Sequence, residues 1–236
     1  MTKHVHRVFV TANGALGETL ELAPTDRRHL ERVLRMRPGA ALEVVDGAGS
    51  VFAAVLEEHG SVRLGALVAE RAERIAPTVW LGSGGGRSDV AIEKLTELGV
   101  REVGALVCER TRGDFRLDRW ARVASAAGRQ SKRVDVPALA GPTPFSEVVG
   151  RPGAIVLDHE AEDAVPFAAA ADGLLLIGPE AGISDAERAL ARAAGAPLAR
   201  LGEGLVLRSE TAAIAAAAVA VFGAAGNERD DAGRLK

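Results

Sequence analysis

Short apolar runs separated by turn residues fill most of the first seventy positions of the chain. Pro38-Gly39 and Asp46-Gly47 are typical turn dipeptides between such runs. The pattern predicts short β-strands at Val5–Val10, Ala41–Val45, Val51–Glu57 and Val62–Val68.

One helical pattern interrupts these strands between Asp26 and Met36. Its apolar residues recur at the spacing of a helix face, so we expect Leu30, Val33 and Leu34 to point inward. Thr25 or Asp26 is placed to cap the start of this helix. Together the elements predict a small, mostly antiparallel β-barrel domain over residues 1–72.

The rhythm changes after Pro77, where strand patterns alternate with helical ones. The expected strands are Val79–Leu81, Glu102–Val107, Ala154–Leu157, Leu174–Ile177 and Leu198–Leu201. The expected helices are Ser88–Leu98, Leu117–Arg129, Asp185–Ala194 and Ser209–Phe222. This alternation predicts an α/β domain over residues 77–226, with a parallel sheet covered by helices on both faces. Such sheets bind ligands beyond the carboxyl ends of their strands. Residues 227–236 read as a frayed tail.

Composition narrows the class of protein. Among 236 residues there is one cysteine, Cys108, so an internal disulfide is excluded and a reducing cytosol is favoured. The first residues lack the apolar core of a signal peptide, and no apolar run approaches the ~20 residues that span a bilayer. We therefore expect a soluble, cytoplasmic protein.

The net charge of −3 conceals two basic clusters, one within the first forty residues and one between Arg110 and Arg133. Basic runs are often solvated faces, but they also bind nucleic acid. The candidate phosphate contacts are Arg7, Arg32, Arg35, Arg87, Arg129 and Arg133.

Two familiar kinds of site are poorly supported by the sequence. The stretch GSGGGRSD, residues 82–89, has Arg87 where a dinucleotide fingerprint needs its third glycine, and it lacks the Gly-Lys-Ser/Thr of a P-loop. The five histidines show no zinc-ligand spacing, and Cys108 has no companion cysteine. We expect no metal site.

A pair of glycine-bearing loops is the stronger signal. Gly178-Pro179-Glu180-Ala181-Gly182 ends one core strand, and RLGEGLVLRSETA, residues 200–212, links another strand end to a helix. Each loop is either an ordinary turn between a strand and a helix, or a segment whose exposed backbone groups hydrogen-bond a flat heterocycle. Ser209 is a good helix cap, and the helix start that it marks is a ready anion site.

In this order the motifs resemble the RsmE-type 16S ribosomal RNA uridine-N3 methyltransferases of the knotted SPOUT superfamily. The resemblance covers nearly the whole chain. It rests on HLERVLRMRPGAALEVVDG at 29–47, EKLTELGV at 93–100, ERT at 109–111, AAGRQSKRVDVP at 126–137, LIGPEAGIS at 176–184 and LVLRSETAA at 205–213.

The resemblance implies an N-terminal PUA-like barrel that helps to grip RNA, and a C-terminal domain with a trefoil knot. The knot loops would hold S-adenosylmethionine in a bent form, and a homodimer would be the active unit. The implied cofactor contacts are Leu157, Leu176, Ile177, Gly178, Pro179, Glu180, Gly182, Leu201, Gly202, Leu207, Arg208, Ser209, Thr211 and Ala212.

The chain departs from the family pattern at several places. Ala181 stands where a second glycine is usual, Gly84 where a basic residue is common, and Arg129 where many members carry glutamate. The segment from Leu201 to Arg208 is one residue longer than usual, which affects the register of Gly202 and Gly204.

The expected reaction is methylation of uridine N3, which requires loss of the N3 proton. Arg208 is the first candidate for stabilising the uridine anion, with Glu210 or Glu180 as the proton acceptor. Glu180 has an alternative role as a carboxylate that caps its turn. Two rival functions share the fold: an RNA-binding ribosome-assembly factor without catalysis, and a SPOUT methyltransferase that acts on transfer RNA.

Overall fold

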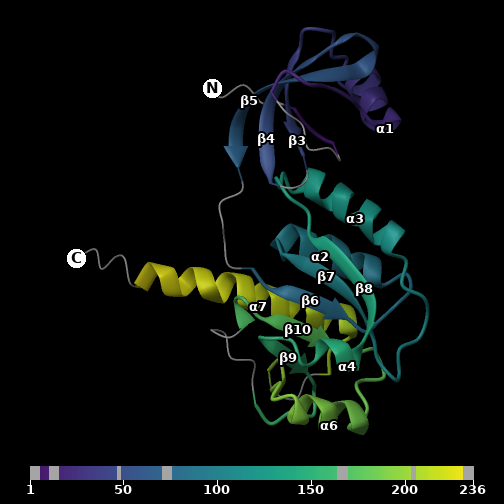
Figure 1. Cartoon of the computed structure of the whole chain (residues 1–236), viewed down its shortest axis with the longest axis vertical. Helices are drawn as coiled ribbons and strands as arrows, with labels where there is room; N and C mark the ends of the chain where they lie inside the picture. The colour runs from purple at the N-terminus through teal and green to yellow at the C-terminus, as the bar shows by residue number, and fades with distance from the viewer. Residues whose placement is uncertain are drawn as a thin grey trace. The chain divides into compact units, whose positions relative to one another are not determined.

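The computed structural model describes residues 6–10, 16–46, 49–70, 76–163, 170–202 and 206–230, with side chains described up to residue 223 (Figure 1). The chain forms two compact units. The first comprises Met1–Glu73 with Gly128–Val136, and the second comprises Arg74–Ala127 with Pro137–Lys236. The segment 128–136, which the sequence pattern assigns to the second domain, therefore packs within the first unit.

The first unit is built on a five-stranded sheet of order β1-β3-β4-β5-β2. The strands are β1 (Arg7–Phe9), β2 (Thr19–Glu21), β3 (Ala41–Val45), β4 (Ser50–Leu56) and β5 (Ser61–Glu70). Only the β1–β3 pair among these is parallel, so the sheet is mixed and mostly antiparallel. Strand β2 carries a single buried side chain, Leu20, which explains why the hydrophobic pattern did not predict it.

The predicted helix of this unit is two short elements, α1 (Pro24–Arg28) and a π-helix, η1 (His29–Val33). Ala23 precedes α1 and Pro24 occupies its first turn, so the prediction of Thr25 or Asp26 as the cap is wrong. Leu30 is buried as predicted, but Val33 is 65% exposed. The wider π turn, in which the Leu34 N–H bonds the His29 carbonyl, changes the phase of the apolar face.

Segment 128–136 is tied to the first unit by apolar and polar contacts. Phe9, Val45 and Val51 form a buried cluster against which Val134 and Val136 pack. Arg129 forms an ion pair with Asp26, and Arg7 donates to the Lys132 carbonyl at 3.2 Å.

The second unit contains an all-parallel six-stranded sheet of order β11-β9-β10-β6-β7-β8 (Figure 1). The strands are β6 (Thr78–Leu81), β7 (Glu102–Val107), β8 (Ala138–Pro144), β9 (Ala154–Leu157), β10 (Leu174–Ile177) and β11 (Leu198–Ala199). The predicted parallel sheet is thus confirmed. Strand β8 was not predicted because it holds Pro142 and Pro144, which a strand tolerates at the sheet edge that β8 occupies.

Helices cover both faces of this sheet: α2 (Ser88–Leu98), α3 (Leu117–Gln130), α4 (Phe145–Val148), α6 (Asp185–Ala193) and α7 (Ser209–Asp230). Trp80, Leu174 and Leu176 lie in one core cluster with residues of α4 and α6. Because side chains alternate along a strand, Leu175 and Ile177 point to the opposite face, where α7 packs against α2, β10 and β6. Helix α7 continues beyond Phe222, where its predicted end lay. The trefoil knot implied by the resemblance stays a prediction.

Among the described residues, no helix combines the length and apolar character that crossing a bilayer would require.

Candidate functional site

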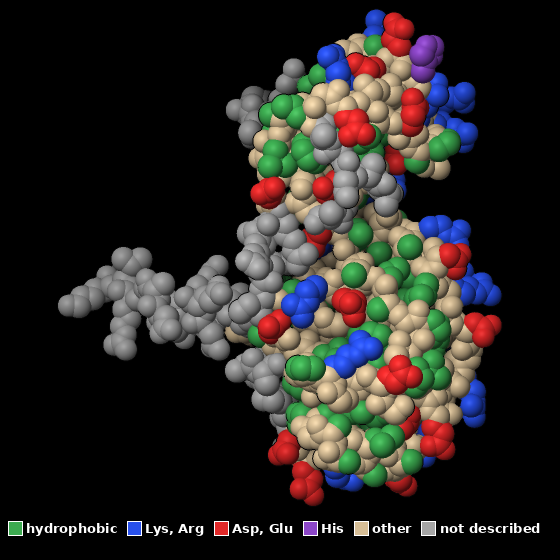
Figure 2. All heavy atoms as spheres, in the orientation of Figure 1, with side chains coloured by type: hydrophobic (Ala, Val, Ile, Leu, Met, Phe, Trp, Pro, Cys, Tyr) green, Lys and Arg blue, Asp and Glu red, His purple; other side chains and the backbone are tan. Residues whose placement is uncertain are grey.

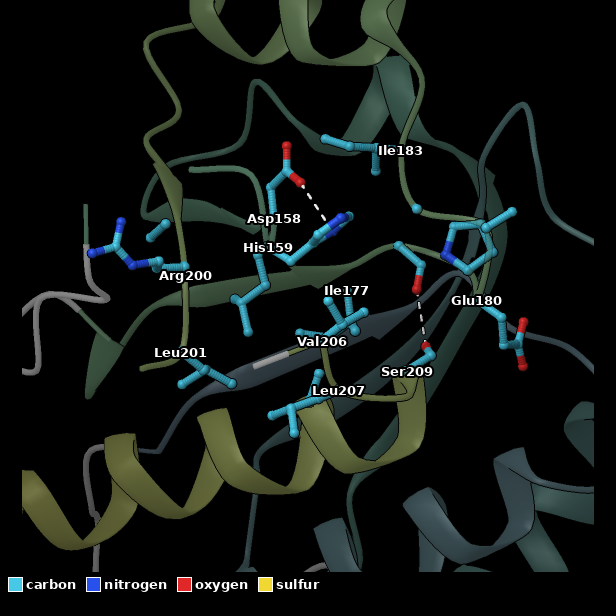
Figure 3. A pocket seen from close by; sticks show the side chains of 17 residues that line it. Asp158, His159, Ile177, Glu180, Ile183, Arg200, Leu201, Val206, Leu207 and Ser209 are labelled. Atoms are coloured by element: carbon cyan, nitrogen blue, oxygen red, sulfur yellow. Dashed lines mark hydrogen bonds and ion pairs between the residues drawn. The ribbon is translucent and has the colours of Figure 1, made fainter. Parts of the chain in front are cut away.

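A half-open cavity of about 270 Å³ lies beyond the carboxyl ends of β9, β10 and β11 (Figure 3). Leu157, Asp158 and His159 reach it from the end of β9, and Ala199 to Leu201 from the end of β11. The loop after β10 and the start of α7 complete it. A parallel sheet places its ligand site at this edge, so the position agrees with the sequence prediction.

The turn after β10 forms one side of the cavity through close backbone contacts. The Gly82 N–H donates to the Ile177 carbonyl at 2.7 Å, and the Gly182 N–H donates to the Pro179 carbonyl at 2.8 Å. Gly182 has φ +70°, which favours glycine. A Cβ on Gly82 would lie 2.7 Å from the backbone nitrogen of Pro179, so this crossing excludes any side chain.

Gly178 leaves little room for a side chain. A Cβ on Gly178 would lie 2.9 Å from Cγ2 of Ile183, which is itself buried. A Cβ here would therefore collide with Ile183, which also lines the cavity, so this position favours glycine.

Residues 109–111 hold this turn from outside the cavity. Nη1 of Arg110 donates to the carbonyl oxygens of Ala181 at 3.0 Å and Ile183 at 3.1 Å. The Thr111 hydroxyl donates to the Gly82 carbonyl at 2.8 Å and accepts from the Cys108 N–H. The ERT motif thus fixes the two backbone segments that cross at Gly82.

A capping box continues the same support into α6. Ser184 caps the helix by accepting from the Glu187 N–H, and a Glu187 oxygen accepts from the Ser184 N–H at 2.7 Å. The other Glu187 oxygen accepts from the Glu109 N–H at 2.9 Å. Burial, reinforced by the charge of Glu187, raises the pKa of the Cys108 thiol to about 12, so the thiol stays protonated near neutral pH.

Ser209 joins the two glycine-bearing loops. It is the first residue of α7, and its hydroxyl donates to the Gly178 carbonyl at 2.9 Å. The hydroxyl therefore satisfies the turn after β10 instead of capping its own helix, which corrects the capping role expected from the sequence.

Two charged residues at the cavity are already engaged in ion pairs or hydrogen bonds. Asp158 is buried and paired with Arg188, whose Nε lies 2.6 Å from a carboxylate oxygen. Burial alone would raise the pKa of Asp158, but the hydrogen bonds and charge of Arg188 and the Glu160 N–H outweigh it, and the pKa lies below its usual value. Arg200 donates to the Ala161 and Glu162 carbonyls. His159 is 43% exposed, with Nδ1 3.6 Å from Asp158 (Figure 3).

The structure gathers most of the predicted cofactor contacts around this cavity. Those that line it are Leu157, Ile177, Gly178, Pro179, Glu180, Gly182, Leu201, Leu207, Ser209 and Ala212. Leu176 lies in the core on the other side of β10, and Gly202, Arg208 and Thr211 are exposed outside the lining. Gly204 lies outside the described residues.

The lining also includes residues that were not among the predicted cofactor contacts: Asp158, His159, Ala181, Ile183, Ala199, Arg200 and Val206. The position of Asp158 and His159 directly after a buried strand is a signal that could have identified them. Arg200 and Val206 carry no comparable signal.

The three candidate catalytic residues occupy different surroundings. Arg208 is exposed and follows the lining residue Leu207. Glu180 is exposed, and its carboxylate points away from the cavity (Figure 3). Glu210 lies beside a separate small cavity formed with the Gly82–Ser88 loop.

The arginines predicted to contact RNA fall into two groups: those that form ion pairs and those that have no ion-pair partner among the described residues. In the first unit Arg7 pairs with Glu43, Arg129 with Asp26, and Arg133 with the buried Asp135. Arg32 and Arg35 are exposed on the same unit, as is Arg87 on the second. Figure 2 shows one face of the molecule, with Lys and Arg side chains interspersed among acidic ones.

Comparison with known proteins places the chain in a family. The model of an RNA methyltransferase domain matches residues 74–221, and that of an RNA methyltransferase PUA domain matches residues 22–64. Ribosomal RNA small subunit methyltransferase E of Mycobacterium bovis is 36% identical over 217 residues, covering 82% of this chain and 83% of that protein. The chain belongs to the ribosomal RNA small subunit methyltransferase E family.

Further proteins are similar to the chain in sequence or in fold. The Synechocystis protein is 32% identical, covering 88% of this chain and 74% of that protein. The Neisseria gonorrhoeae member, solved with bound S-adenosylmethionine, is 26% identical with a TM-score of 0.75, covering 94% of this chain and 98% of that one. A Legionella pneumophila structure in complex with the same cofactor is 28% identical with a TM-score of 0.76, at the same coverage. The resemblance seen in the sequence motifs is thereby confirmed.

Proposed function

We propose that this protein transfers the methyl group of S-adenosylmethionine to N3 of a uridine in 16S ribosomal RNA. The observation that carries the proposal is the cavity at the ends of β9, β10 and β11, built from two glycine-bearing loops that the Ser209–Gly178 hydrogen bond joins. The names of the relatives supply the substrate class, and the bound cofactor of two related structures supplies the methyl donor.

The lining of the cavity suits S-adenosylmethionine. Leu157, Ile177, Leu201 and Leu207 provide apolar surface for a purine, while the turn at Gly178–Gly182 brings backbone groups to the lining. Cofactor pockets combine such apolar walls with a few polar groups. Bound there, the cofactor would supply a methyl group on a sulfonium sulfur.

In this reaction the protein mainly positions the two reactants, accepts a proton and stabilises the charge of the uridine anion. The N3 nitrogen forms a bond to the methyl carbon as the carbon–sulfur bond breaks, and S-adenosylhomocysteine leaves. The N3 proton must pass to a base, and we assign it to Glu210 rather than Glu180, whose carboxylate points away from the cavity. Arg208 stabilises the uridine anion. N3 lies on the pairing edge of the base, so the target uridine must be unpaired or flipped out.

The RNA-binding role belongs foremost to the exposed arginines. Arg32 and Arg35 on the first unit and Arg87 on the second have no ion-pair partner among the described residues. Free guanidinium groups bind phosphate bidentately. Arg7, Arg129 and Arg133 bind acidic side chains of their own unit, so any RNA role for them competes with that pairing.

The active unit is a cytoplasmic homodimer in this proposal. Helix α7 keeps Phe222 65% exposed, and Ile214, Ala218 and Val219 half-buried. Small and apolar residues on one helix favour close packing against a symmetry-related copy. Light scattering tests this directly, since a mass of 24.5 kDa at micromolar concentration would indicate a monomer.

Mass mapping of modified nucleosides, with and without the gene, tests the reaction. The proposal predicts that one N3-methyluridine in small-subunit RNA disappears on deletion and returns on complementation. Unchanged ribosomal RNA with a lost transfer RNA methyl group would instead favour the transfer RNA enzyme. No lost modification at all, with defective subunit assembly, would favour an assembly factor.

A further inference from the structure

A second, much smaller cavity lies between the Gly82–Ser88 loop and the first turn of α7. Its volume is about 10 Å³, which is close to the space that one water molecule needs. Ser209 lines both this cavity and the larger one, so the two are neighbours. Glu210 and Arg87 are its charged residues.

Ser83 contributes the polar group that distinguishes this cavity. Its side chain is buried, with 7% of the residue exposed, and its hydroxyl has no hydrogen-bond partner among the described residues. A buried hydroxyl without a partner is costly and requires an explanation.

The other serine hydroxyls of this cavity donate their protons to backbone carbonyl oxygens. Ser88 donates to the Gly85 carbonyl and accepts from Nε1 of Trp120 at 3.1 Å. Ser209 donates to the Gly178 carbonyl. A serine hydroxyl has one proton and two acceptor sites, so Ser88 and Ser209 can only accept further bonds. Ser83 is therefore the serine of the cavity with a proton to give, and Glu210 supplies the carboxylate.

We infer that Ser83 is a positioning residue, whose hydroxyl holds a water molecule against the carboxylate of Glu210. The water would accept from Ser83 and donate to Glu210 and to a lone pair of Ser88 or Ser209. These bonds satisfy the buried hydroxyl and fall within the two to four that a buried water typically makes.

The charged residues near Glu210 are either arginines or are paired with other residues. Arg87 is the other charged group in the cavity, and Arg208 precedes Glu210 by two residues. On the packed helix α2, the charged residues pair with other partners: Asp89 with Arg119, and Lys94 with Glu93 and Glu97. Strands β6 and β10, which also pack against α7, carry no charged residue.

This inference rests on the proposed function, in which Glu210 accepts the proton of uridine N3. A water that donates to one carboxylate oxygen fixes the orientation of the oxygen that receives the proton. Loss of the water would slow the chemical step without disturbing the cofactor, because Ser83 does not line the larger cavity.

The test is a double-mutant cycle with Ser83→Ala, Glu210→Gln and the double variant. The kcat and the KM for small-subunit RNA are measured in methyl transfer, together with cofactor affinity and thermal unfolding. We expect Ser83→Ala to lower kcat about threefold or more while the KM for the RNA stays unchanged. Cofactor affinity should not change. In the Glu210→Gln background, Ser83→Ala should have little further effect.

Each outcome decides a separate claim. Independent, multiplicative losses of kcat, or an unchanged kcat in Ser83→Ala, would overturn the inference while leaving the proposed function intact. Absence of methyl transfer by the wild-type protein would overturn the proposed function itself. A crystal structure showing density for a water between Ser83 and Glu210 would support the inference, and a direct Ser83–Glu210 bond would contradict it.

Discussion

The hydroxyl of Ser209 donates a 2.9 Å hydrogen bond to the carbonyl oxygen of Gly178, across 31 positions of sequence. This contact links the start of α7 to the turn after β10, so the two loops form one site. Ser209→Ala should weaken S-adenosylmethionine binding about two- to tenfold, the range expected for loss of one hydrogen bond. Calorimetry checks this against Ser146→Ala, an exposed serine of α4 that should bind as the wild type does.

Arg110 should matter for cofactor binding although it does not line the cavity. Arg110→Ala removes both hydrogen bonds to the Ala181 and Ile183 carbonyls and should lower affinity about tenfold or more. The neighbouring Arg112 is exposed and makes only a weak 3.4 Å contact with the Thr111 carbonyl. Equal losses in Arg110→Ala and Arg112→Ala would show that charge, rather than support of the turn, explains the effect.

Two glycines of one loop should differ in their tolerance of alanine. Gly82→Ala forces a Cβ to within 2.7–2.9 Å of the backbone and ring atoms of Gly178 and Pro179, so both thermal stability and cofactor affinity should fall. Gly86→Ala meets no described atom within 4 Å and has no positive φ, so it should leave both unchanged. Thermal unfolding and calorimetry on the two variants decide the matter.

Acid should weaken the fold partly through Asp158. Its pKa in the folded state lies below the ordinary value of about 3.9 that the unfolded chain retains. The ionised carboxylate therefore stabilises the fold above that ordinary value, and this contribution is lost as pH falls through the lower folded value. Asp158→Asn should melt below the wild type at pH 6, and the gap should narrow toward pH 3. A gap that does not vary with pH would show that the pairing with Arg188 is not responsible.

The arginines of the first unit should separate into structural and RNA-binding groups. Arg129→Ala leaves Asp26 without its partner and should lower stability by about 1 kcal/mol, or 2–4 °C in Tm. Arg32→Ala with Arg35→Ala should leave Tm unchanged, weaken RNA binding and reduce the log–log salt slope by about one per arginine. Filter binding at several salt concentrations and thermal unfolding test both groups. An unaltered salt slope in the double variant would refute the RNA role.

Buried strands and amphipathic helices were readable from the sequence because their hydrophobic patterns are strong. Glu102–Val107, Ala154–Leu157, Leu174–Ile177 and Ser88–Leu98 have the predicted bounds. Strand β8 was missed because its prolines argue against a strand wherever the sheet order is unknown. The packing of segment 128–136 in the first unit depends on contacts with Phe9 and Asp26 from far along the chain, which no local pattern records.

The site was also partly predictable from the sequence. Glycines at strand ends identified both loops, and the motif order identified the family. Sequence did not show that Arg110 and Thr111 support the crossing at Gly82, because these contacts depend on the fold that joins them. Nor did it show that Ile183 packs so closely against Gly178 that a Cβ there would collide with it.

The most direct test of the proposed reaction is to incubate purified protein with methyl-labelled S-adenosylmethionine and small-subunit ribosomal RNA, either free or in assembled particles. Nuclease digestion and mass spectrometry then locate the label. We expect label on N3 of a single uridine, with severe loss of transfer in Arg208→Ala while most RNA affinity remains. Label on a ribose or on another base, or transfer that persists undiminished in Arg208→Ala, would contradict it.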